Sequence, residues 1–264
     1  MDVGVIISEI SDAISSARQI EPFSKRGGIE FSQKMAYKIA GEAKARVDTS
    51  PLIGRKIGFT NRGIWAKYGV DQPIWGDITS SSLKYYVGDE MDVSLNSFCE
   101  PRIEPEIVVC LKTAPSLGAN NAEIAACIDW VAPGLEIVDS IYPKWLFSVT
   151  DSIVAGGLHG SLLVGKRIPT KSNIEQDLLK AHVSLFQNGS FSEEGTGANV
   201  LDGPVSAIRY LLESLECFAD QRPLASGDVI TTGTMTDAKP VFSGDEWSAV
   251  FSGVIDSSLK IKFT

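Results

Sequence analysis

The sequence is poor in the features that mark disulfide-rich, zinc-binding and nucleic-acid-binding proteins. Its four cysteines include no C-x-x-C pair, and it has only two histidines. We therefore expect neither a disulfide framework nor a zinc clip. Lysine and arginine total 24 against 33 acidic residues, and the formal net charge is -9. Nucleic acids and acidic membranes attract basic surfaces, so we expect neither as a partner.

Long hydrophobic runs are also missing. None approaches the roughly 20 residues that a membrane-spanning helix requires. The opening stretch carries Asp2, Glu9 and Asp12 within its apolar pattern, unlike the basic leader of a signal peptide. We therefore expect a soluble, cytoplasmic protein.

The first 50 residues predict a helical segment. Apolar residues recur at helical spacing through residues 3–19 and again through residues 30–47. Two more helices are expected, at residues 122–131 and at residues 205–218. The last of these follows Gly203-Pro204, and proline suits the first turn of a helix.

Beyond Pro51 the pattern changes to short apolar runs separated by Gly, Asp, Asn and Pro, which is typical of strands and turns. Strands are expected at residues 56–59, 93–95, 103–111, 135–138, 161–164, 182–187, 228–232 and 248–262. Asn188-Gly189 predicts a hairpin turn, because both central residues of that turn need a positive φ. The prediction is an α+β protein with a helical segment at residues 1–50 and a strand-rich domain at residues 51–264.

One predicted strand opens with two acids. In the stretch "RIEPEIVVCL", Glu104 and Glu106 stand two residues apart, so a strand would point both to the same face. If that face is shielded from water, their repulsion raises at least one pKa unless a cation lies between them. Mg²⁺ or Mn²⁺, which prefer oxygen ligands, would resolve the conflict. The alternative is a solvent-facing edge strand that uses charge to prevent aggregation.

A third acid favours the metal interpretation. Glu136 lies within "GLEIVD", another short apolar strand, where a solvated acid is unexpected. With Glu104 and Glu106 it makes a candidate carboxylate triad that leaves coordination positions for water and substrate. Asp139 and Asp151 are reserve ligands.

Carboxylate-held metals are often completed by a chelating substrate, and a 2-oxo acid offers its oxo group and carboxylate together. The cation then acts as a Lewis acid that stabilises the enolate formed at the neighbouring carbon. "GRKIGFT" supplies Arg55 as a candidate substrate-binding residue and Lys56 as a candidate proton carrier, because a lysine in a dry site has a lowered pKa. A surface lysine on an edge strand is the alternative.

Six segments together resemble a known family. They are "GRKIGFT", "YGVDQPIWGDI", "PRIEPEIVVCL", "GLEIVDS", "NVLDGPVSAIRYL" and "LASGDVITTGTMTDAKPV". In this order they are similar to the 2-oxopent-4-enoate hydratase and 4-oxalocrotonate decarboxylase family of the fumarylacetoacetate hydrolase superfamily. The resemblance implies a fumarylacetoacetase-like mixed β-roll as the catalytic domain, a divalent cation, a small 2-oxo acid from aromatic-compound catabolism as substrate, and a homo-oligomer.

The resemblance also assigns roles to residues. The family's metal-binding acids fall on Glu104, Glu106 and Glu136. Lys56 corresponds to the lysine that handles the proton during enol-to-keto conversion. Asp77 of "WGDI" is expected beside Lys56, where it would set the lysine's charge. Thr234 of "TTGTMT" matches a position that contacts the substrate carboxylate.

One segment departs from the hydratase pattern. Where an Asp-Asn pair or a similar acid is expected after Val-Ala, this chain reads Gly156-Gly157, and His159 follows closely. His159 is either a structural histidine or a general base that activates water. A general base is what a C–C bond hydrolase requires.

The first functional hypothesis is therefore a metal-dependent hydratase of a 2-oxopent-4-enoate-type acid. The alternatives are a C–C bond hydrolase of an acylpyruvate such as maleylpyruvate or fumarylpyruvate, and an oxalocrotonate-type decarboxylase. A non-enzymatic member that keeps the metal as a structural clip is the fourth.

Overall fold

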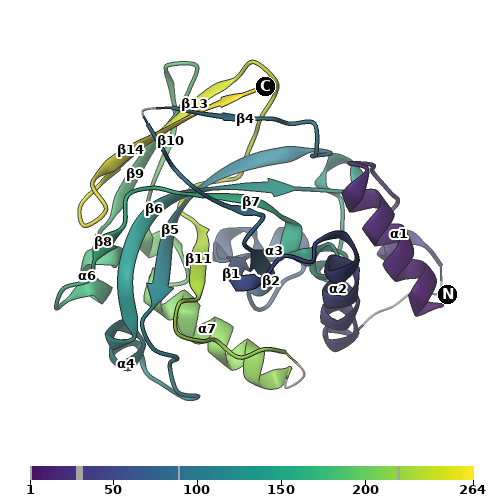
Figure 1. Cartoon of the computed structure of the whole chain (residues 1–264), viewed down its shortest axis with the longest axis horizontal. Helices are drawn as coiled ribbons and strands as arrows, with labels where there is room; N and C mark the ends of the chain where they lie inside the picture. Colours follow the sequence, from purple (N-terminus) through teal and green to yellow (C-terminus); the bar gives the residue numbers. More distant parts are fainter. Residues whose placement is uncertain (1, 28–31, 89, 219–220) are drawn as a thin grey trace.

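The computed structural model describes residues 2–27, 32–88, 90–218 and 221–264. Two curled sheets form its centre, with helices at one end and below them (Figure 1). This arrangement confirms the predicted α+β class.

The larger sheet has nine strands. Seven follow one another across the sheet, and β12 and β8 pair at its sides with β5 and β6. In spatial order the seven are β2 (Ile74–Thr79), β1 (Leu52–Gly58), β11 (Val229–Thr234), β5 (Pro101–Leu111), β6 (Ile128–Asp139), β7 (His159–Val164) and β3 (Leu83–Tyr85). The side strands are β12 (Lys239–Pro240) and β8 (Ile168–Pro169).

The smaller sheet has five strands and lies at the top of Figure 1. Its order is β10 (Ser190–Thr196), β9 (His182–Gln187), β13 (Glu246–Ser252), β14 (Ser257–Phe263) and β4 (Met91–Val93). The turn at Asn188-Gly189 joins β9 to β10, with φ of 51° and 77°. The hairpin prediction is thereby confirmed.

Helices cover the remaining sides. They are α1 (Val3–Ser15), α2 (Gln33–Val47), α3 (Trp65–Tyr68), α4 (Asn121–Ala126), α5 (Val149–Val154), α6 (Ile174–Leu179) and α7 (Pro204–Cys217). Helices α1 and α2 lie together at one end of the molecule (Figure 1), and α2 packs on α5. The predicted beginning of the second helix, residues 30 and 31, lies outside the described residues. Ile10 of α1 and Ile153 of α5 belong to one continuous hydrophobic core, which therefore crosses the expected boundary after residue 50.

Two secondary-structure predictions were wrong. The helix expected through residue 131 ends at Ala126, and β6 begins at Ile128. The single strand expected at residues 248–262 is the hairpin β13–β14, turning near Gly253 with a φ of 91°. Short apolar runs suit helix or strand equally, and only pairing with distant partners decides between them.

Strand β5 lies near the middle of the large sheet, paired with β11 on one side and β6 on the other. Its residues alternate between two environments. Ile103 and Ile107 face the main core. Val108 faces the other way, into a smaller apolar cluster. Glu104 and Glu106 share the face of Val108, so the sheet pairings bring them to a partly enclosed side of the sheet.

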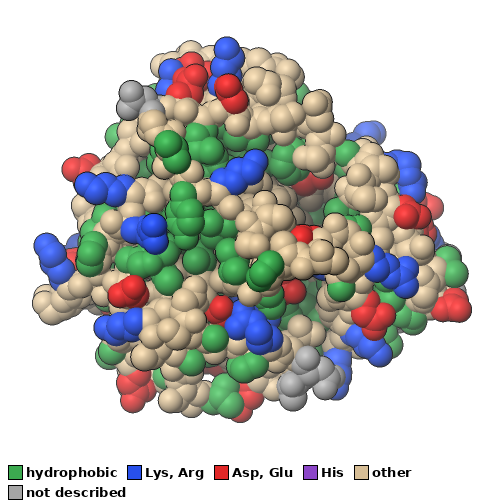
Figure 2. Space-filling model, viewed as in Figure 1, with side chains coloured by type: hydrophobic (Ala, Val, Ile, Leu, Met, Phe, Trp, Pro, Cys, Tyr) green, Lys and Arg blue, Asp and Glu red, His purple; other side chains and the backbone are tan. Residues whose placement is uncertain are grey.

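The surface carries charges of both signs. On the face shown in Figure 2, basic and acidic side chains alternate around a central hydrophobic area. Among the described residues, no helix is both long and apolar enough to cross a membrane.

We predict that Asp151→Ala lowers the free energy of unfolding by about 1–3 kcal/mol, because the groups that donate hydrogen bonds to this carboxylate lose their acceptor. The Asp151 side chain is fully buried and accepts hydrogen bonds from the backbone amides of Ser24 and Ser148, at 3.2 and 2.9 Å, and from both hydroxyls. Urea denaturation of the metal-free protein measures the change. Asp12→Ala, on the exposed side of α1, is the control and should change it by less than about 0.5 kcal/mol. Equal effects of the two substitutions would contradict a stabilising role for the hydrogen bonds of Asp151.

Candidate metal centre

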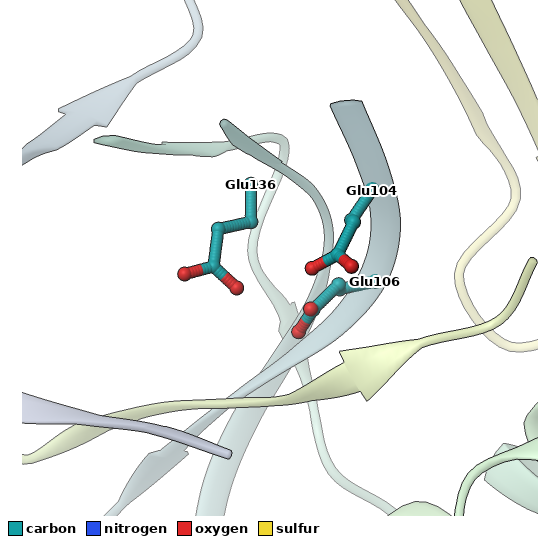
Figure 3. A group of neighbouring side chains, drawn as sticks. All are labelled: Glu104, Glu106 and Glu136. Atoms are coloured by element: carbon teal, nitrogen blue, oxygen red, sulfur yellow. The ribbon is translucent and has the colours of Figure 1, made fainter. Parts of the chain in front are cut away.

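Three glutamates converge at the centre of the large sheet. Glu104, Glu106 and Glu136 each offer a carboxylate oxygen, and these oxygens lie within 4.8 Å of one another. Figure 3 shows Glu104 and Glu106 projecting from one strand, with the carboxylate of Glu136 facing them from the neighbouring strand. The cause is the register of β5 against β6, in which Glu104 lies directly opposite Glu136. The shared face predicted for Glu104 and Glu106 is confirmed.

Glu106 is held by one of its two oxygens. It has no exposed surface, and its Oε2 accepts hydrogen bonds from the Thr231 hydroxyl and from the Gly233 amide, the latter at 2.8 Å. Its Oε1 is buried without a hydrogen-bond partner. A buried oxygen of this kind costs free energy unless a donor or a cation meets it.

Glu136 is held in the same way. Its Oε1 lies 2.7 Å from Nδ1 of His159 and 3.6 Å from Nζ of Lys56. Its Oε2 is buried without a hydrogen-bond partner. Both fully buried glutamates thus keep one oxygen fixed and one free, which is the donor set that a hard divalent cation requires.

The charges of the cluster are divided unequally. Burial and the neighbouring carboxylates raise the pKa of Glu106 well above its usual value. Burial raises the pKa of Glu104 to about 7. Lys56 acts against this rise, and the charge of Glu136 adds to it. Glu136 is different, because Lys56 and His159 outweigh its burial and lower its pKa. Raised carboxyl pKa values are what the sequence predicted for acids crowded out of water.

The expected lowering of the lysine pKa was wrong. Lys56 is 3% exposed, and burial by itself does lower its pKa. Glu136, Glu104 and Glu106 act in the opposite direction and together raise it. Three nearby carboxylates favour the ammonium form more strongly than desolvation disfavours it.

Two expected neighbours of the cluster lie elsewhere. Arg55 is 1% exposed and forms an ion pair with Asp77 at 2.9 Å. Arg55 also donates a hydrogen bond to the Arg222 carbonyl at 3.1 Å. Asp77 was expected beside Lys56, but the register of β1 and β2 sets it opposite Arg55. Consecutive strand residues point to opposite faces, so Arg55 is turned away from the side of Lys56.

The reserve ligands are also engaged elsewhere. Asp139 accepts hydrogen bonds from the backbone amides of Cys99 and Glu100, both at 2.7–3.0 Å. Asp151 is bonded to Ser24 and Ser148 as described above. Neither belongs to the carboxylate cluster.

A pocket of about 360 Å³ opens above the cluster. The residues that line it include Lys56, Glu104, Thr234, Arg102, Trp145 and Lys239. Thr234 pairs with Glu106 in the sheet, and its hydroxyl donates to the Thr236 carbonyl at 2.9 Å. The structure thus brings Lys56 and Thr234 to the same pocket as Glu104.

His159 lies behind Glu136. Its side chain is 2% exposed, and Nε2 lies 2.9 Å from the Ser82 hydroxyl while Nδ1 contacts Glu136. Gly156, Gly157 and Leu158, which precede it, all have positive φ, between 64° and 70°. His159 lines a second cavity, of about 60 Å³, together with Asp77.

Sequence reasoning missed three residues that shape this centre. Thr231 and Gly233 hold Glu106, and Ser82 holds His159. Thr231 lies in the predicted strand at residues 228–232, but its contact with Glu106 depends on the pairing of β11 with β5. No local pattern marks such a long-range contact.

The fold and the cluster define an α+β protein with a buried carboxylate centre at the foot of a pocket. The sequence matches the fumarylacetoacetate (FAA) hydrolase C-terminal family over residues 80–256. The chain therefore belongs to the fumarylacetoacetate hydrolase family, as its motifs predicted.

Known relatives are similar over most of the chain. A 2-hydroxyhexa-2,4-dienoate hydratase of Comamonas testosteroni is 28% identical over 256 residues, which cover 96% of this chain and 94% of the relative. A 4-oxalocrotonate decarboxylase of a Pseudomonas species is 32% identical over 187 residues, 70% of this chain and 69% of the relative. The solved structure of 4-oxalocrotonate decarboxylase from Pseudomonas putida G7, complexed with magnesium and adipate, has a TM-score of 0.89 and 26% identity. That match covers 99% of this chain and 97% of the other.

The raised pKa of Glu104 predicts how the stability of the metal-free protein changes with pH. The pKa is about 7 in the folded protein against 4.5 ordinarily, so the folded state holds this proton more tightly than the unfolded state. Stability should fall as pH rises between these two values. Urea denaturation in EDTA between pH 4.5 and 8 measures the fall.

The control is Glu104→Gln, which has no proton to lose at this position and should make the fall smaller, leaving the part that the raised pKa of Glu106 causes. A wild-type profile that falls no more steeply than that of the variant would contradict the shift.

Proposed function

We propose that this protein is a divalent-metal-dependent enzyme acting on a 2-oxo acid, with Mg²⁺ or Mn²⁺ held by Glu104, Glu106 and Glu136. The observation that carries the proposal is the pair of buried oxygens, Oε1 of Glu106 and Oε2 of Glu136, that have no hydrogen-bond partner. Both belong to carboxylates whose other oxygen is fixed by protein contacts. When bound, the cation supplies Lewis-acid stabilisation of negative charge on the substrate's 2-oxo oxygen.

We assign the proton transfer to Lys56. Its ammonium lies beside Glu136 and lines the pocket above the carboxylates. A protonated lysine at this position can deliver a proton to the substrate carbon during enol-to-keto conversion. A divalent charge nearby counteracts the glutamates, so metal binding makes Lys56 a stronger acid.

Hydration of a 2-oxopent-4-enoate-type acid is the reaction that we favour. In it, water adds across the distal double bond of the conjugated acid. The similarity to the Comamonas testosteroni hydratase along nearly the whole chain supports this choice. Decarboxylation of an oxalocrotonate-type acid is the second candidate, supported by the similarity to the decarboxylases. Hydrolysis of an acylpyruvate is the third.

For His159 we propose a positioning role. Both ring nitrogens are engaged, by Glu136 and by Ser82, so neither is free to take a proton from water. A histidine bonded to a carboxylate ligand fixes the orientation of that ligand. Catalytic roles for Arg55 and Asp77 have less support, because their ion pair lies away from the pocket with the glutamates.

A cytoplasmic homo-oligomer completes the proposal. The cytoplasmic location is supported by four free cysteines, since cytosolic thiols stay reduced. The oligomer rests on the family resemblance, and light scattering of the purified protein measures its mass.

Turnover should depend on the metal and on Glu106. We expect Mg²⁺-dependent product formation with at least one of 2-hydroxypentadienoate, oxalocrotonate and maleylpyruvate. Chromatography of the reaction mixtures identifies the products. Glu106→Gln should abolish turnover and weaken Mg²⁺ binding by roughly 100-fold or more, because a ligand charge is lost. Titration calorimetry measures the binding. Wild-type metal affinity in this variant, or turnover that survives EDTA, would refute the metal assignment.

Replacing His159 separates positioning from general-base catalysis. His159→Ala should weaken metal binding by about 10–100-fold and lower turnover at limiting Mg²⁺. Saturating Mg²⁺ should then restore most of kcat, because the alanine variant retains every ligand. A kcat that stays low at saturating metal would instead identify a general base. His182→Ala is the control, since that side chain lies 36% exposed beside Glu194 on the smaller sheet.

A further inference from the structure

A chain of polar contacts leads from the carboxylate cluster to the end of helix α2, and the proposed chemistry does not use it. His159 contacts Glu136 at 2.7 Å through Nδ1, and its Nε2 lies 2.9 Å from the Ser82 hydroxyl. Ser82 is 8% exposed and lies in the turn between β2 and β3. This turn therefore holds the side of the imidazole ring that faces away from the glutamate.

The turn holds Ser82 through Thr79. The Ser82 hydroxyl donates to the Thr79 carbonyl and accepts from the Thr79 amide, both at 3.2 Å. Thr79 is 3% exposed, and its hydroxyl oxygen lies 3.3 Å from that of Ser82. A displacement of Thr79 would therefore displace Ser82 as well.

Asp48, which directly follows α2, holds the turn from the other side. Its Oδ2 accepts hydrogen bonds from the hydroxyls of Thr79 and Ser81, at 2.5 and 2.7 Å, and its Oδ1 accepts from the amide and the hydroxyl of Ser50. Burial acts to raise the pKa of Asp48, but the hydrogen bonds from Ser50, Thr79 and Ser81 prevail and lower it. Hydrogen bonds to an ionised carboxylate are stronger than those between neutral groups, so Asp48 is a firm anchor for the turn.

We infer that Asp48, Thr79 and Ser82 are positioning residues, which orient His159 and through it the proposed metal ligand Glu136. The metal affinity of the centre is then set in part at the end of α2. This inference rests on the proposed function, because it takes Glu136 as a ligand. Partners behind a metal ligand influence how tightly the metal is bound, and connected hydrogen bonds strengthen one another.

Titration calorimetry with Mg²⁺ gives the first test. Ser82→Ala should weaken Mg²⁺ binding by about 3–10-fold, less than the removal of His159, because the histidine keeps Glu136 but loses its support. Ser80→Ala is the matched control, since it removes a hydroxyl from an exposed position of the same turn. It should leave the affinity unchanged.

Two substitutions at Thr79 separate the effect of its hydroxyl from that of its shape. Thr79→Val keeps the branched side chain but loses the hydroxyl, so it should weaken Mg²⁺ binding as Ser82→Ala does. Thr79→Ser keeps the hydroxyl and should retain wild-type affinity. Asp48→Asn exchanges one accepting oxygen for a donor and should also weaken binding. Urea denaturation shows which variants are folded, and if Thr79→Val is not, Ser82→Ala and Asp48→Asn decide.

The metal-free protein gives an independent readout. The chain has two histidines, so nitrogen NMR of histidine-labelled protein is simple to assign, and His182→Ala identifies the signals of His159. Ser82→Ala and Thr79→Val should shift the ring nitrogen resonances of His159. Ser80→Ala and Thr79→Ser should leave them in place.

Each other outcome decides against the inference. If Ser82→Ala and Asp48→Asn lower the free energy of unfolding but leave Mg²⁺ affinity unchanged, the chain of contacts only stabilises the fold. If Thr79→Ser weakens binding as much as Thr79→Val, the shape of the side chain matters and its hydroxyl does not. If the His159 resonances do not respond to Ser82→Ala, the serine does not orient the ring. If the wild-type protein itself fails to bind Mg²⁺, the proposed metal centre is wrong and the inference is rejected with it.

Discussion

The crowding of three carboxylates at one point of a sheet, two of them fully buried, is the constraint on which this site depends. Glu106 and Glu136 have no exposed surface, and like charges out of water repel strongly. Three ionised carboxylates and the Lys56 ammonium leave two negative charges, which one divalent cation neutralises. In the metal-free protein, protons replace the cation, because the pKa values of Glu104 and Glu106 are raised. On the proposed function, the same positions exchange protons for metal.

The protein contacts around the cluster prepare it for this exchange. Thr231 and Gly233 fix one oxygen of Glu106, and His159 fixes one oxygen of Glu136. Fixing the ligands in advance reduces the ordering that metal binding must otherwise supply. The fixed oxygens accept hydrogen bonds from protein donors, and one carboxylate oxygen of each glutamate lies within 4.8 Å of those of the other two. The cluster thus combines rigid ligands with unsatisfied charge.

The alternation of a strand made part of this site predictable from sequence. It placed Glu104 and Glu106 on one face, and apolar flanks marked Glu136 as a buried acid. The same rule separates Arg55 from Lys56, because neighbours on a strand face opposite sides, although the sequence analysis treated them together. The opposition of Glu104 and Glu136 could not be predicted, since register depends on pairing across the sheet. The strand at residues 128–131 was likewise decided by its partners, β5 and β8.

The residues that support the chemistry differ from those that determine which substrate is used. Hydration, decarboxylation and C–C cleavage of a 2-oxo acid all need charge stabilised at the oxo oxygen and a proton moved nearby. The carboxylates and Lys56 can serve all three, so they do not distinguish among them. The difference must come from other residues that line the pocket, among them Arg102 and Trp145. Because specificity is a difference in affinity between ligands, these residues discriminate more between substrates than the anionic centre that all three reactions share.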